Sequence, residues 1–474
     1  MKIVAYTEEF VEHARGMPIS PRPPGKVCGH RVGLLTPYGG PNLGDAVIQD
    51  AVIANLRLRL SGLRISGICL DSRNFIERHG EDAFPLCMSN LAFYGMCHPG
   101  EEGQSDSNES LSDQGNRIWK KVVKGLLRKV PGAGPLEKTL RRYFATIRRE
   151  FRHCLEAYRF VRTQELLIVS GGGQLDDEWG GPWGHPYCLF KFAVIAKCAR
   201  VPFAFVSVGA CKLSSPLSLC FLSVALNLAC YRSYRDANSR RIAAKCHAPA
   251  IDDPVVPDLA FSLPPSVFPR PAGIRSLAQG RPIVAVSPIA YAKSGVWPTQ
   301  NQSLYERYKR QMTLVLSRLV SQGYFVVLIW SSLGDDDQTA SELMARLNPS
   351  IRNSQGGQIH IPEITTWANA AALLLDADFL IASRLHSTIL GFMTNTPVVA
   401  ISFDPKVDWV MQDLGQTEVL LGINNFTAGD VLQALKALEL SRGVTFKQIA
   451  TYRDRISTQL SIQYDTLAKL AGGE

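Results

Sequence analysis

The chain has 474 residues, which suits two or three domains better than a single hydrophobic core. Hydrophobic residues make up 46% and charged residues 20% of the sequence, which excludes a disordered or fibrous protein. The net charge of +9 favours an acidic partner, such as a phosphate-bearing substrate, an anionic membrane surface or a nucleic acid.

The N-terminus and the cysteines indicate a cellular compartment. Because the first residues carry no apolar segment before a small-residue cleavage site, we expect no secretory signal. The 11 cysteines stand singly without metal-ligand spacing, which fits reduced thiols better than disulfides or a zinc site. The sequence therefore predicts a cytoplasmic protein and leaves open a peripheral position at the inner face of the membrane.

The first half of the chain alternates short apolar strands with helical segments, as a parallel α/β sheet does. Before it, residues 1–29 are rich in proline and glycine and predict a loose arm. An uncharged run at 213–231 is too short in its strongly apolar part to span a bilayer, so it predicts a buried or surface-seeking helix. The predicted strands are 31–36, 166–170 and 202–208, and the predicted helices are 46–60 and 217–229.

An insertion interrupts this first half at residues 100–155. Its polar beginning, 100–116, predicts a loop or disorder, and residues 117–152 form a strongly basic block. Aromatic and aliphatic residues lie between the cations of this block, which predicts amphipathic helices. Contact with an anionic membrane and a simple solvated surface explain such helices equally well.

The second half repeats the alternation after a proline-containing linker at 262–282. The predicted strands are 283–287, 324–330, 379–383 and 398–402. The predicted helices are 304–320, 338–347, 366–375 with Thr366 as its cap, 385–393 and 446–470. We therefore predict an α/β protein of two Rossmann-like, doubly wound domains, 1–265 and 280–474, with a ligand-binding cleft between them.

Glycine-containing loops follow two of the predicted strands, at residues 39–45 and 171–177. Glycines such as Gly44 and Gly171 to Gly173 let backbone N–H groups approach an anion closely, and a helix N-terminus adds a favourable dipole. Each loop alone is more often a tight turn. Neither matches the phosphate loop or the dinucleotide fingerprint, so a nucleotide triphosphatase and a dehydrogenase are unsupported.

The sharpest local signal is Ser383-Arg384-Leu385-His386, which lies between a predicted strand and a predicted helix. Arginine binds a carboxylate or phosphate through two parallel hydrogen bonds, and histidine titrates near neutrality and can act as a general acid. An isolated histidine is more often a capping or packing residue. The neighbouring Arg384 makes the two interpretations of His386 about equal.

Several short motifs follow the predicted strands in a fixed order. They are Asn42-x-Gly44-Asp45, Gly171-Gly172-Gly173, Ser207-Val208-Gly209, Tyr234-Arg235-Asp236, Pro257-Asp258-Leu259-Ala260-Phe261, Ser383-Arg384-Leu385-His386 and Phe403-Asp404-Pro405-Lys406. With these motifs in this order, the chain resembles the polysaccharide pyruvyl transferase family over roughly residues 31–415.

The resemblance implies a two-domain fold like that of the GT-B glycosyltransferases, phosphoenolpyruvate as donor, and no metal or other cofactor. The expected reaction transfers the pyruvyl group to a sugar as a ketal, in polysaccharide or glycoconjugate biosynthesis. It also implies that Arg384, His386 and Arg235 act on the donor. We expect further substrate contacts from the other motif positions, namely Leu385, Asn42, Gly44, Gly171, Gly172, Gly173 and Lys406.

The chemistry of this reaction suggests roles for two residues. Ketal formation needs a proton at the methylene carbon of the donor and attack by a sugar hydroxyl at the neighbouring carbon. A protonated His386 can supply that proton, with His185 as the next candidate. Asp45 can take the hydroxyl proton, although a role as helix cap explains it equally well.

Three alternatives remain open from the sequence. Asp335-Asp336-Asp337 resembles the Asp-x-Asp motif of metal-dependent glycosyltransferases. Aspartate clusters also commonly start helices, and we favour this helix-cap interpretation. A metal-independent GT-B glycosyltransferase using a nucleotide sugar is the enzyme alternative. A non-catalytic scaffold that docks on a membrane through the basic block is the other, and no motif supports a nucleic-acid partner.

The acceptor is the least defined partner. The loop after the triple glycine is long and aromatic, with Trp179, Trp183, His185 and Tyr187. Neither this loop nor the basic block belongs to the core pattern of the family. The resemblance therefore does not define the acceptor sugar. If the protein contacts a membrane, that contact would bring it to a lipid-linked acceptor.

Overall fold

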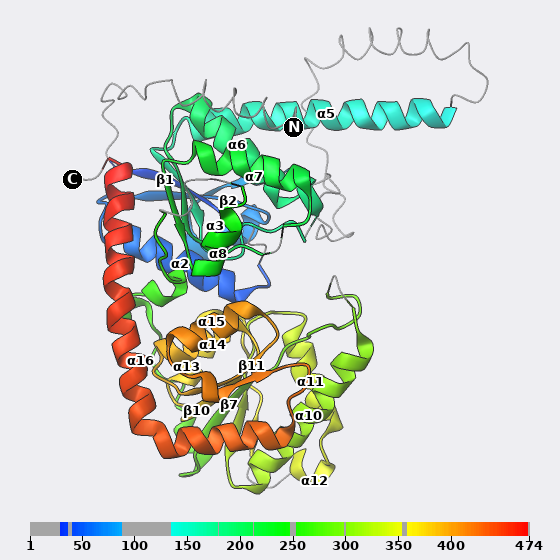
Figure 1. Cartoon of the computed structure of the whole chain (residues 1–474), viewed down its shortest axis with the longest axis vertical. Coiled ribbons are helices and arrows are strands. Elements are labelled where there is room, and N and C mark those ends of the chain that lie inside the picture. Colours follow the sequence, from blue (N-terminus) through cyan, green and yellow to red (C-terminus); the bar gives the residue numbers. More distant parts are fainter. Residues whose placement is uncertain are drawn as a thin grey trace.

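The computed structural model describes residues 29–36, 40–87, 134–178, 180–211, 213–246, 253–297, 300–352 and 358–472. The chain forms two α/β domains, each built on a six-stranded parallel sheet, and one domain stands above the other (Figure 1). The predicted N-terminal arm, apart from Gly29, lies outside the described residues, as do the polar stretch 100–116 and residues 117–133 of the basic block.

The first sheet has the strand order β3-β2-β1-β4-β5-β6. The order reverses between β1 and β4, which makes the carboxyl ends of these strands the place where a ligand is expected. Its strands are β1 Arg31–Leu35, β2 Arg64–Cys69, β3 Asp82–Pro85, β4 Leu166–Ser170, β5 Phe203–Val208 and β6 Tyr231–Tyr234. Its helices are α2 Leu43–Arg57, α3 Ser72–His79, α5 Gly134–Val161, η1 Gly181–Trp183, α6 His185–Ala199, α7 Pro216–Leu228 and α8 Ala237–Ala243.

The second sheet has the strand order β12-β11-β10-β7-β8-β9 and reverses between β7 and β10. Its strands are β7 Ile283–Ser287, β8 Phe325–Leu328, β9 Ile359–His360, β10 Phe379–Ala382, β11 Val398–Ser402 and β12 Leu420–Gly422. Its helices are α10 Gln302–Ser321, α11 Asp336–Arg346, α12 Pro349–Arg352, α13 Trp367–Leu374, α14 Leu385–Met393, α15 Pro405–Asp413 and α16 Ala428–Leu470. The short helices η3 Leu259–Ser262, η4 Pro265–Val267, α9 Arg275–Ala278 and η5 Thr417–Val419 complete the described chain.

The predicted fold class of two doubly wound sheets is confirmed. Both faces of the first sheet are buried, and alternate residues of a strand join different cores because they point to opposite faces. On β4, Leu166 and Ile168 join a core that continues into the second domain, whereas Leu167 and Val169 face a separate core beneath α5, α6 and α7. Uniformly apolar strands are typical of such a two-sided parallel sheet.

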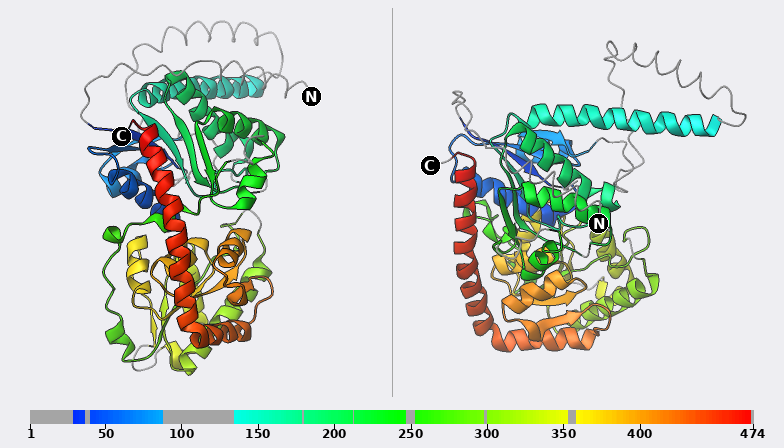
Figure 2. Two further views of the ribbon diagram at one scale, coloured as in Figure 1. Left: turned by 60° about the vertical axis from the view of Figure 1, so that its left-hand side comes forward. Right: turned by 45° about the horizontal axis from the view of Figure 1, so that its top comes forward.

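The terminal helix α16 starts well before the predicted residue 446, at Ala428, where Thr427 and Asp430 form a reciprocal capping box. It has 43 residues and runs back along the second domain onto the first (Figures 1 and 2). Its Gln463 donates to Ser207 at 2.9 Å and accepts from Ser233 at 2.5 Å, both in the first domain. The helix is therefore shared by both domains.

Residues 213–231 contain α7 and no other helix. Across the part of the chain that the structure describes, no helix combines the length and the apolar character that a bilayer crossing requires.

Candidate active site

The loops at the carboxyl ends of the two sheets meet between the domains. Gly44, at the start of α2, packs directly against the ring of His386 in α14, because a Cβ on Gly44 would lie 2.1 Å from His386 Nδ1. Gly173, after β4, faces Lys406 of α15, whose Nζ would lie 3.7 Å from a Cβ at this position. Two of the predicted loops of the first domain therefore contact predicted residues of the second.

Asp258 lies at the centre of this contact. One of its carboxylate oxygens, Oδ2, lies 3.2 Å from Arg235 Nη1 and 3.9 Å from His386 Nε2. The other oxygen, Oδ1, accepts from the Ala260 backbone N–H at 3.0 Å and so caps η3. A buried carboxylate, at 3% exposure, thus holds an arginine of one domain beside a histidine of the other.

Three buried nitrogens of this cluster have no hydrogen-bond partner. Nε and Nη2 of Arg235 and Nε2 of His386 form no hydrogen bond with any residue that the structure describes, and Asp236 Oδ2 lies 3.6 Å from Arg235 Nε. Leaving a buried donor unsatisfied costs about 1–3 kcal/mol, and more for a charged group. Gly209 gives the guanidinium its room, because a Cβ there would lie 2.5 Å from Arg235 Nη2. These donors indicate a site for an anion.

Lys406 adds a second fixed cation. Its Nζ lies 3.4 Å from Asp404. Burial and Arg235 oppose its charge, but Asp404 and the Cys211 thiol outweigh them and leave the pKa of Lys406 raised. The ammonium group therefore stays charged at neutral pH and complements the Arg235 guanidinium.

A small cavity opens beside these cations. Its volume is about 30 Å³, close to the share of one water molecule. A larger anion therefore enters only if side chains or the two domains move. The lining residues are Arg235, Asp236, Pro257, Asp258, Leu385, Lys406, Trp409, Val410, Asp413 and Tyr452.

Asp45 and His386 have opposite pKa shifts with one common cause. Burial raises the pKa of Asp45, and His386, Arg235 and Lys406 offset this only in part. Burial lowers the pKa of His386, against the opposing effect of Asp258 and Asp45. Each group is thus pushed toward its neutral form, and the two titrate under each other's influence.

Asn42, and not Asp45, caps helix α2. The side chain of Asn42 accepts from the Gly44 backbone N–H at 3.0 Å and donates to Asp45 Oδ2 at 2.8 Å. The capping role considered for Asp45 is therefore wrong. Asn42 instead fixes the Asp45 carboxylate beside the glycine loop, where a Cβ on Gly172 would lie 3.5 Å from Asp45 Oδ1.

Two glycines of the triple-glycine loop, Gly171 and Gly172, are needed for the backbone conformation. Gly171 and Gly172 have positive φ angles of 50° and 68°, which favour glycine. A side chain at Gly171 would also meet Leu259 and Ile48 at 3.1 Å. Gly171 therefore packs against the core, and Gly172 and Gly173 are the members of the triplet nearest to the ionisable residues.

Arg384 is not among the residues that line the cavity. Its Nε and Nη2 donate to the two oxygens of Asp336 at 2.5 and 2.8 Å, so its planar fork is occupied within the second domain. Asp336 also accepts from the Ala290 backbone N–H at 3.1 Å and is fully buried. The structure therefore separates the predicted pair, because His386 contacts Gly44 of the first domain whereas Arg384 pairs with Asp336. His386 and Asp45 are, like Arg384, not among the residues that line the cavity.

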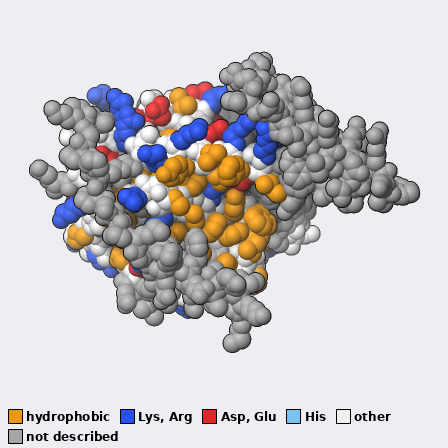
Figure 3. Space-filling view, turned by 90° about the horizontal axis from the view of Figure 1, so that it is seen from above, with side chains coloured by type: hydrophobic (Ala, Val, Ile, Leu, Met, Phe, Trp, Pro, Cys, Tyr) orange, Lys and Arg blue, Asp and Glu red, His pale blue; other side chains and the backbone are white. Residues whose placement is uncertain are grey.

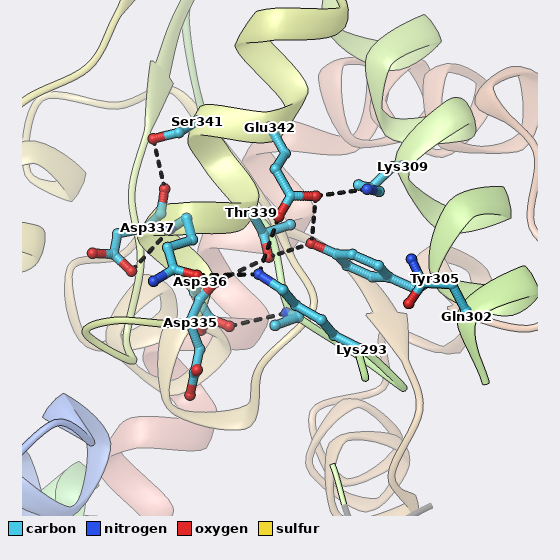
Figure 4. A network of polar contacts seen from close by, with 12 residues as sticks. Lys293, Gln302, Tyr305, Lys309, Asp335, Asp336, Asp337, Thr339, Ser341 and Glu342 are labelled. Carbon is cyan, nitrogen blue, oxygen red and sulfur yellow. Dashed lines mark hydrogen bonds and ion pairs between the residues drawn. The ribbon is translucent and has the colours of Figure 1, made fainter. Parts of the chain in front are cut away.

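The three aspartates start helix α11, as predicted, but each in a different way (Figure 4). Asp335 stands at the N-cap without a side-chain cap bond, and Asp337 accepts from the Gln338 N–H at 2.9 Å. Asp336 is the ion-pair partner described above. No group of three His, Cys, Asp or Glu side chains in the described residues is arranged to hold a metal ion.

A wider hollow of about 540 Å³ lies along the same helix, lined by Trp330, Asp337, Gln338, Ser341 and Glu342. Figure 4 shows Glu342 in a network with Lys293, Lys309 and Tyr305. Burial opposes its charge, but the two lysines outweigh this and lower the pKa of Glu342. The carboxylate is thus neutralised by its neighbours.

The structure places His185, the second candidate acid, against Gln174 of the loop after the triple glycine. His185 is buried, its Nε2 lies 2.6 Å from Gln174 Oε1, and burial lowers its pKa to about 4. It lines neither cavity described above. Trp179 lies outside the described residues.

Asp258, Asp404 and Cys211 belong to the site but were not predicted from the sequence as site residues. Asp258 and Asp404 stand in the quoted motifs, and their acidic side chains next to predicted cations were the available signal. Cys211 follows the Ser207-Val208-Gly209 motif but has no pattern of its own. Its role depends on Lys406, which is distant in the sequence and close only in the fold.

The fold is the two-domain α/β fold of the GT-B type. The Staphylococcus aureus MnaA structure with UDP is 10% identical, with 89% of this chain and 90% of that chain covered and a TM-score of 0.50. A UDP-GlcNAc 2-epimerase from Methanocaldococcus jannaschii is 9% identical, with 86% and 92% covered and a TM-score of 0.50. At these identities the likeness establishes the fold alone.

The chain belongs to the polysaccharide pyruvyl transferase family, whose model matches residues 42–405. The match contains Asp45, Arg235, Asp258 and His386, and Lys406 follows it directly. The amylovoran biosynthesis protein AmsJ of Erwinia amylovora is 24% identical over 129 residues, or 27% of this chain and 31% of AmsJ. That similarity thus spans about a third of the relative.

Proposed function

We propose that this protein transfers the pyruvyl group of phosphoenolpyruvate to a sugar, forming a pyruvate ketal during polysaccharide or glycoconjugate biosynthesis. The observation that carries the proposal is the set of buried nitrogens without a hydrogen-bond partner, on Arg235 and His386, beside the cation Lys406. Family membership supports pyruvyl transfer, and the name of AmsJ supports polysaccharide biosynthesis.

The donor matches the charges of the site. Phosphoenolpyruvate carries a carboxylate and a phosphate. Nε and Nη2 of Arg235 form no hydrogen bond within the described residues, and the carboxylate or the phosphate can bind there through two hydrogen bonds in competition with Asp236, 3.6 Å from Nε. Lys406 then neutralises the other group. Leu385 lines the same cavity and excludes water from the apolar methylene end of the donor.

In the proposed reaction His386 gives a proton to the methylene carbon, which becomes the methyl group. A sugar hydroxyl attacks the adjacent carbon and passes its proton to Asp45. The C–O bond to phosphate then breaks, and protonated Asp45 returns its proton to the leaving phosphate. A second hydroxyl of the same sugar closes the ketal and gives its proton to neutral His386, which restores both groups. One phosphoenolpyruvate and one sugar diol thus yield one ketal and one inorganic phosphate.

Arg384 can bind the donor only after its ion pair with Asp336 has opened. Its predicted contact with the donor requires the ion pair to Asp336 to open, because both oxygens of Asp336 occupy its fork. In the structure as it stands, this pair instead fixes the backbone just before His386. The proposal therefore assigns donor binding to Arg235 and Lys406 first.

The proposal is tested by incubating the purified chain with phosphoenolpyruvate and a panel of nucleotide-linked and lipid-linked sugars. We expect phosphate release that depends on one acceptor, together with a product whose mass corresponds to the ketal. Release of a nucleoside diphosphate without use of phosphoenolpyruvate would instead indicate a glycosyltransferase. No turnover with any acceptor, and no binding of phosphoenolpyruvate, would favour the scaffold.

A further inference from the structure

An apolar stripe runs along the solvent side of helix α5. Ile147, Phe151 and Leu155 are 49%, 65% and 45% exposed. Their spacing of four residues places them on one side of the helix. The inward side of α5 is occupied by His153, Ala157 and Val161, which are fully buried.

The stripe continues onto the neighbouring helices. Glu150 of α5 binds Lys191 of α6 at 2.9 Å and the Tyr187 hydroxyl at 3.1 Å, which fixes α5 beside α6. Beyond this contact, Trp183 is 46% exposed and its ring lies 5.5 Å from that of Phe221 in α7.

Figure 3 shows apolar side chains gathered on this side of the molecule, with Lys and Arg beside them. We call this surface the apolar face. It consists of Ile147, Phe151, Leu155, Trp183, Phe190, Leu217 and Phe221.

A row of arginines borders the stripe. Arg148, Arg149, Arg152 and Arg159 are exposed and form no ion pair with the residues that the structure describes. Among the described side chains of α5, Glu156 is the only exposed acid. Glu150 is partly buried and is neutralised by Lys191. The helix thus presents an apolar stripe and a net positive charge side by side.

We propose that the apolar face and its arginine row bind the surface of an anionic lipid bilayer, with α5 lying in the headgroup layer. Contiguous exposed apolar patches of this kind are uncommon on a monomer and mark an interaction site. Apolar residues enter the headgroup boundary while the arginines pair with lipid phosphates, as in amphipathic interfacial helices. The contact extends the membrane contact predicted for the basic block to residues of α6 and α7.

Charge decides between a bilayer and a second copy of the chain. A two-fold interface would place each arginine row against the same surface of the partner. The described side chains of α5 offer one exposed acid, Glu156, against the four arginines, so the like charges of two such helices would repel. An anionic bilayer supplies the missing negative charge and also covers the apolar side chains.

The apolar face is connected to the candidate active site through a single segment. Gly173 borders the site, and the chain reaches Trp183 of the apolar face ten residues later. A bilayer bound at Trp183 is thus linked to the site by ten residues of chain, and its use for a lipid-linked acceptor rests on the proposed function. The membrane contact itself does not depend on the proposed reaction.

Sedimentation with vesicles tests the contact. We compare vesicles of phosphatidylcholine alone with vesicles that also contain phosphatidylglycerol, at two salt concentrations. We expect binding to the anionic vesicles that weakens with salt. The variant Arg148→Gln/Arg149→Gln/Arg152→Gln should lose about 100-fold in partitioning, from about 1 kcal/mol per cation near the surface.

A matched pair of variants separates the apolar contribution from general hydrophobicity. Phe151→Ser/Leu155→Ser should lose binding to anionic vesicles by at least about tenfold. Leu440→Ser/Val444→Ser in α16 removes apolar residues with the same spacing that are 82% and 59% exposed, and should bind like the parent.

The proposal is overturned if the parent binds neither vesicle, binds both equally at all salt concentrations, or if both double variants behave alike. A change of the oligomeric mass of Phe151→Ser/Leu155→Ser in sedimentation velocity, without vesicle binding by the parent, would show a subunit interface instead. Circular dichroism of each variant shows that its fold is intact.

Discussion

At the scale of single residues, the candidate site depends on how buried charges are compensated. Asp258 holds Arg235 at 3.2 Å and His386 at 3.9 Å, but it satisfies only part of the donors of Arg235. Removing one partner of such a group leaves a buried charge uncompensated and is strongly destabilising. Asp258 is therefore a positioning residue in this account, and the donor completes the set of charges.

His386→Gln tests the proposed acid. Glutamine keeps the size and hydrogen bonding but cannot give a proton, so kcat should fall roughly 10²- to 10⁴-fold. The affinity for phosphoenolpyruvate, measured by calorimetry, should change only a few-fold. A Gln variant that turns over at close to the parent rate would show that His386 only binds or packs.

The pH dependence follows from the shifted pKa of His386. The acid must be protonated, and burial lowers its pKa in the free protein below the ordinary 6.5. Activity measured as kcat/KM should therefore fall as pH rises through this lowered value. Bound donor adds negative charge and raises the pKa, so the alkaline limb of kcat should lie at higher pH. Coincident limbs, or limbs in the reverse order, would contradict this assignment.

Arg235 and Arg384 are distinguished by comparing their lysine variants. Arg235→Lys keeps the charge but loses the free fork, so donor binding should weaken by about 2 kcal/mol, or roughly 30-fold. Arg384→Lys should weaken it less, because Asp336 occupies that fork. Calorimetry that finds equal losses would show that Arg384 leaves Asp336 and reaches the donor.

At the scale of elements, the first turn of α2 is built around the ring of His386. A Cβ on Gly44 would lie 2.1 Å from Nδ1, closer than any real contact, so Gly44→Ala must displace the ring. We expect at least a tenfold loss of kcat. Gly443→Ala in α16 is the control, since no atom lies within 4 Å of its Cβ, and it should stabilise the protein by up to about 1 kcal/mol. Equal activity of the two variants would contradict the contact.

Local patterns in the sequence predict the elements that alternate regularly, but they miss those that depend on distant partners. The Thr366 cap is confirmed because its capping box lies within four residues. Strand β2 was missed because Gly67 interrupts its apolar run. The structure explains the glycine, since a Cβ there would lie 2.6 Å from the Phe75 ring. Such packing cannot be read from the local sequence.

The site shows the same division between local and distant information. The strand-end loops around Gly44, Gly173 and His386 were predicted, because the carboxyl ends of parallel strands share one edge. The ion pair between Arg384 and Asp336 was not, because its partners are 48 residues apart and meet only in the folded second domain. The sequence around a strand end thus predicts at which edge of the sheet a residue lies, but not with which side chain it forms an ion pair.

At the scale of the whole molecule, the two domains form a closed arrangement. One hydrophobic core runs from α2 through η3 into the second domain, and α16 joins both domains. The cavity of about 30 Å³ is too small for phosphoenolpyruvate. Binding therefore requires a change in the domain arrangement or its side chains, as in enzymes whose sites close around substrate.

We expect the proposed reaction of the whole protein to proceed without metal ions. In the proposed complex Arg235 and Lys406 neutralise the donor's negative charge, and in the structure Asp336 of the aspartate triplet binds Arg384. Turnover should therefore be unchanged in excess chelator. Loss of activity that Mg²⁺ or Mn²⁺ restores would point to the metal-dependent glycosyltransferase alternative.

The central claim is that the pyruvyl carbons of phosphoenolpyruvate end up on a sugar. The most direct measurement uses phosphoenolpyruvate labelled with ¹³C in the pyruvyl group, the purified chain and the acceptor panel, with products analysed by NMR. The account predicts a labelled methyl group and a labelled ketal carbon on one sugar, with one phosphate released per ketal, and neither product from His386→Gln. Phosphate release without label on any sugar, or sugar transfer that proceeds without phosphoenolpyruvate, would contradict it.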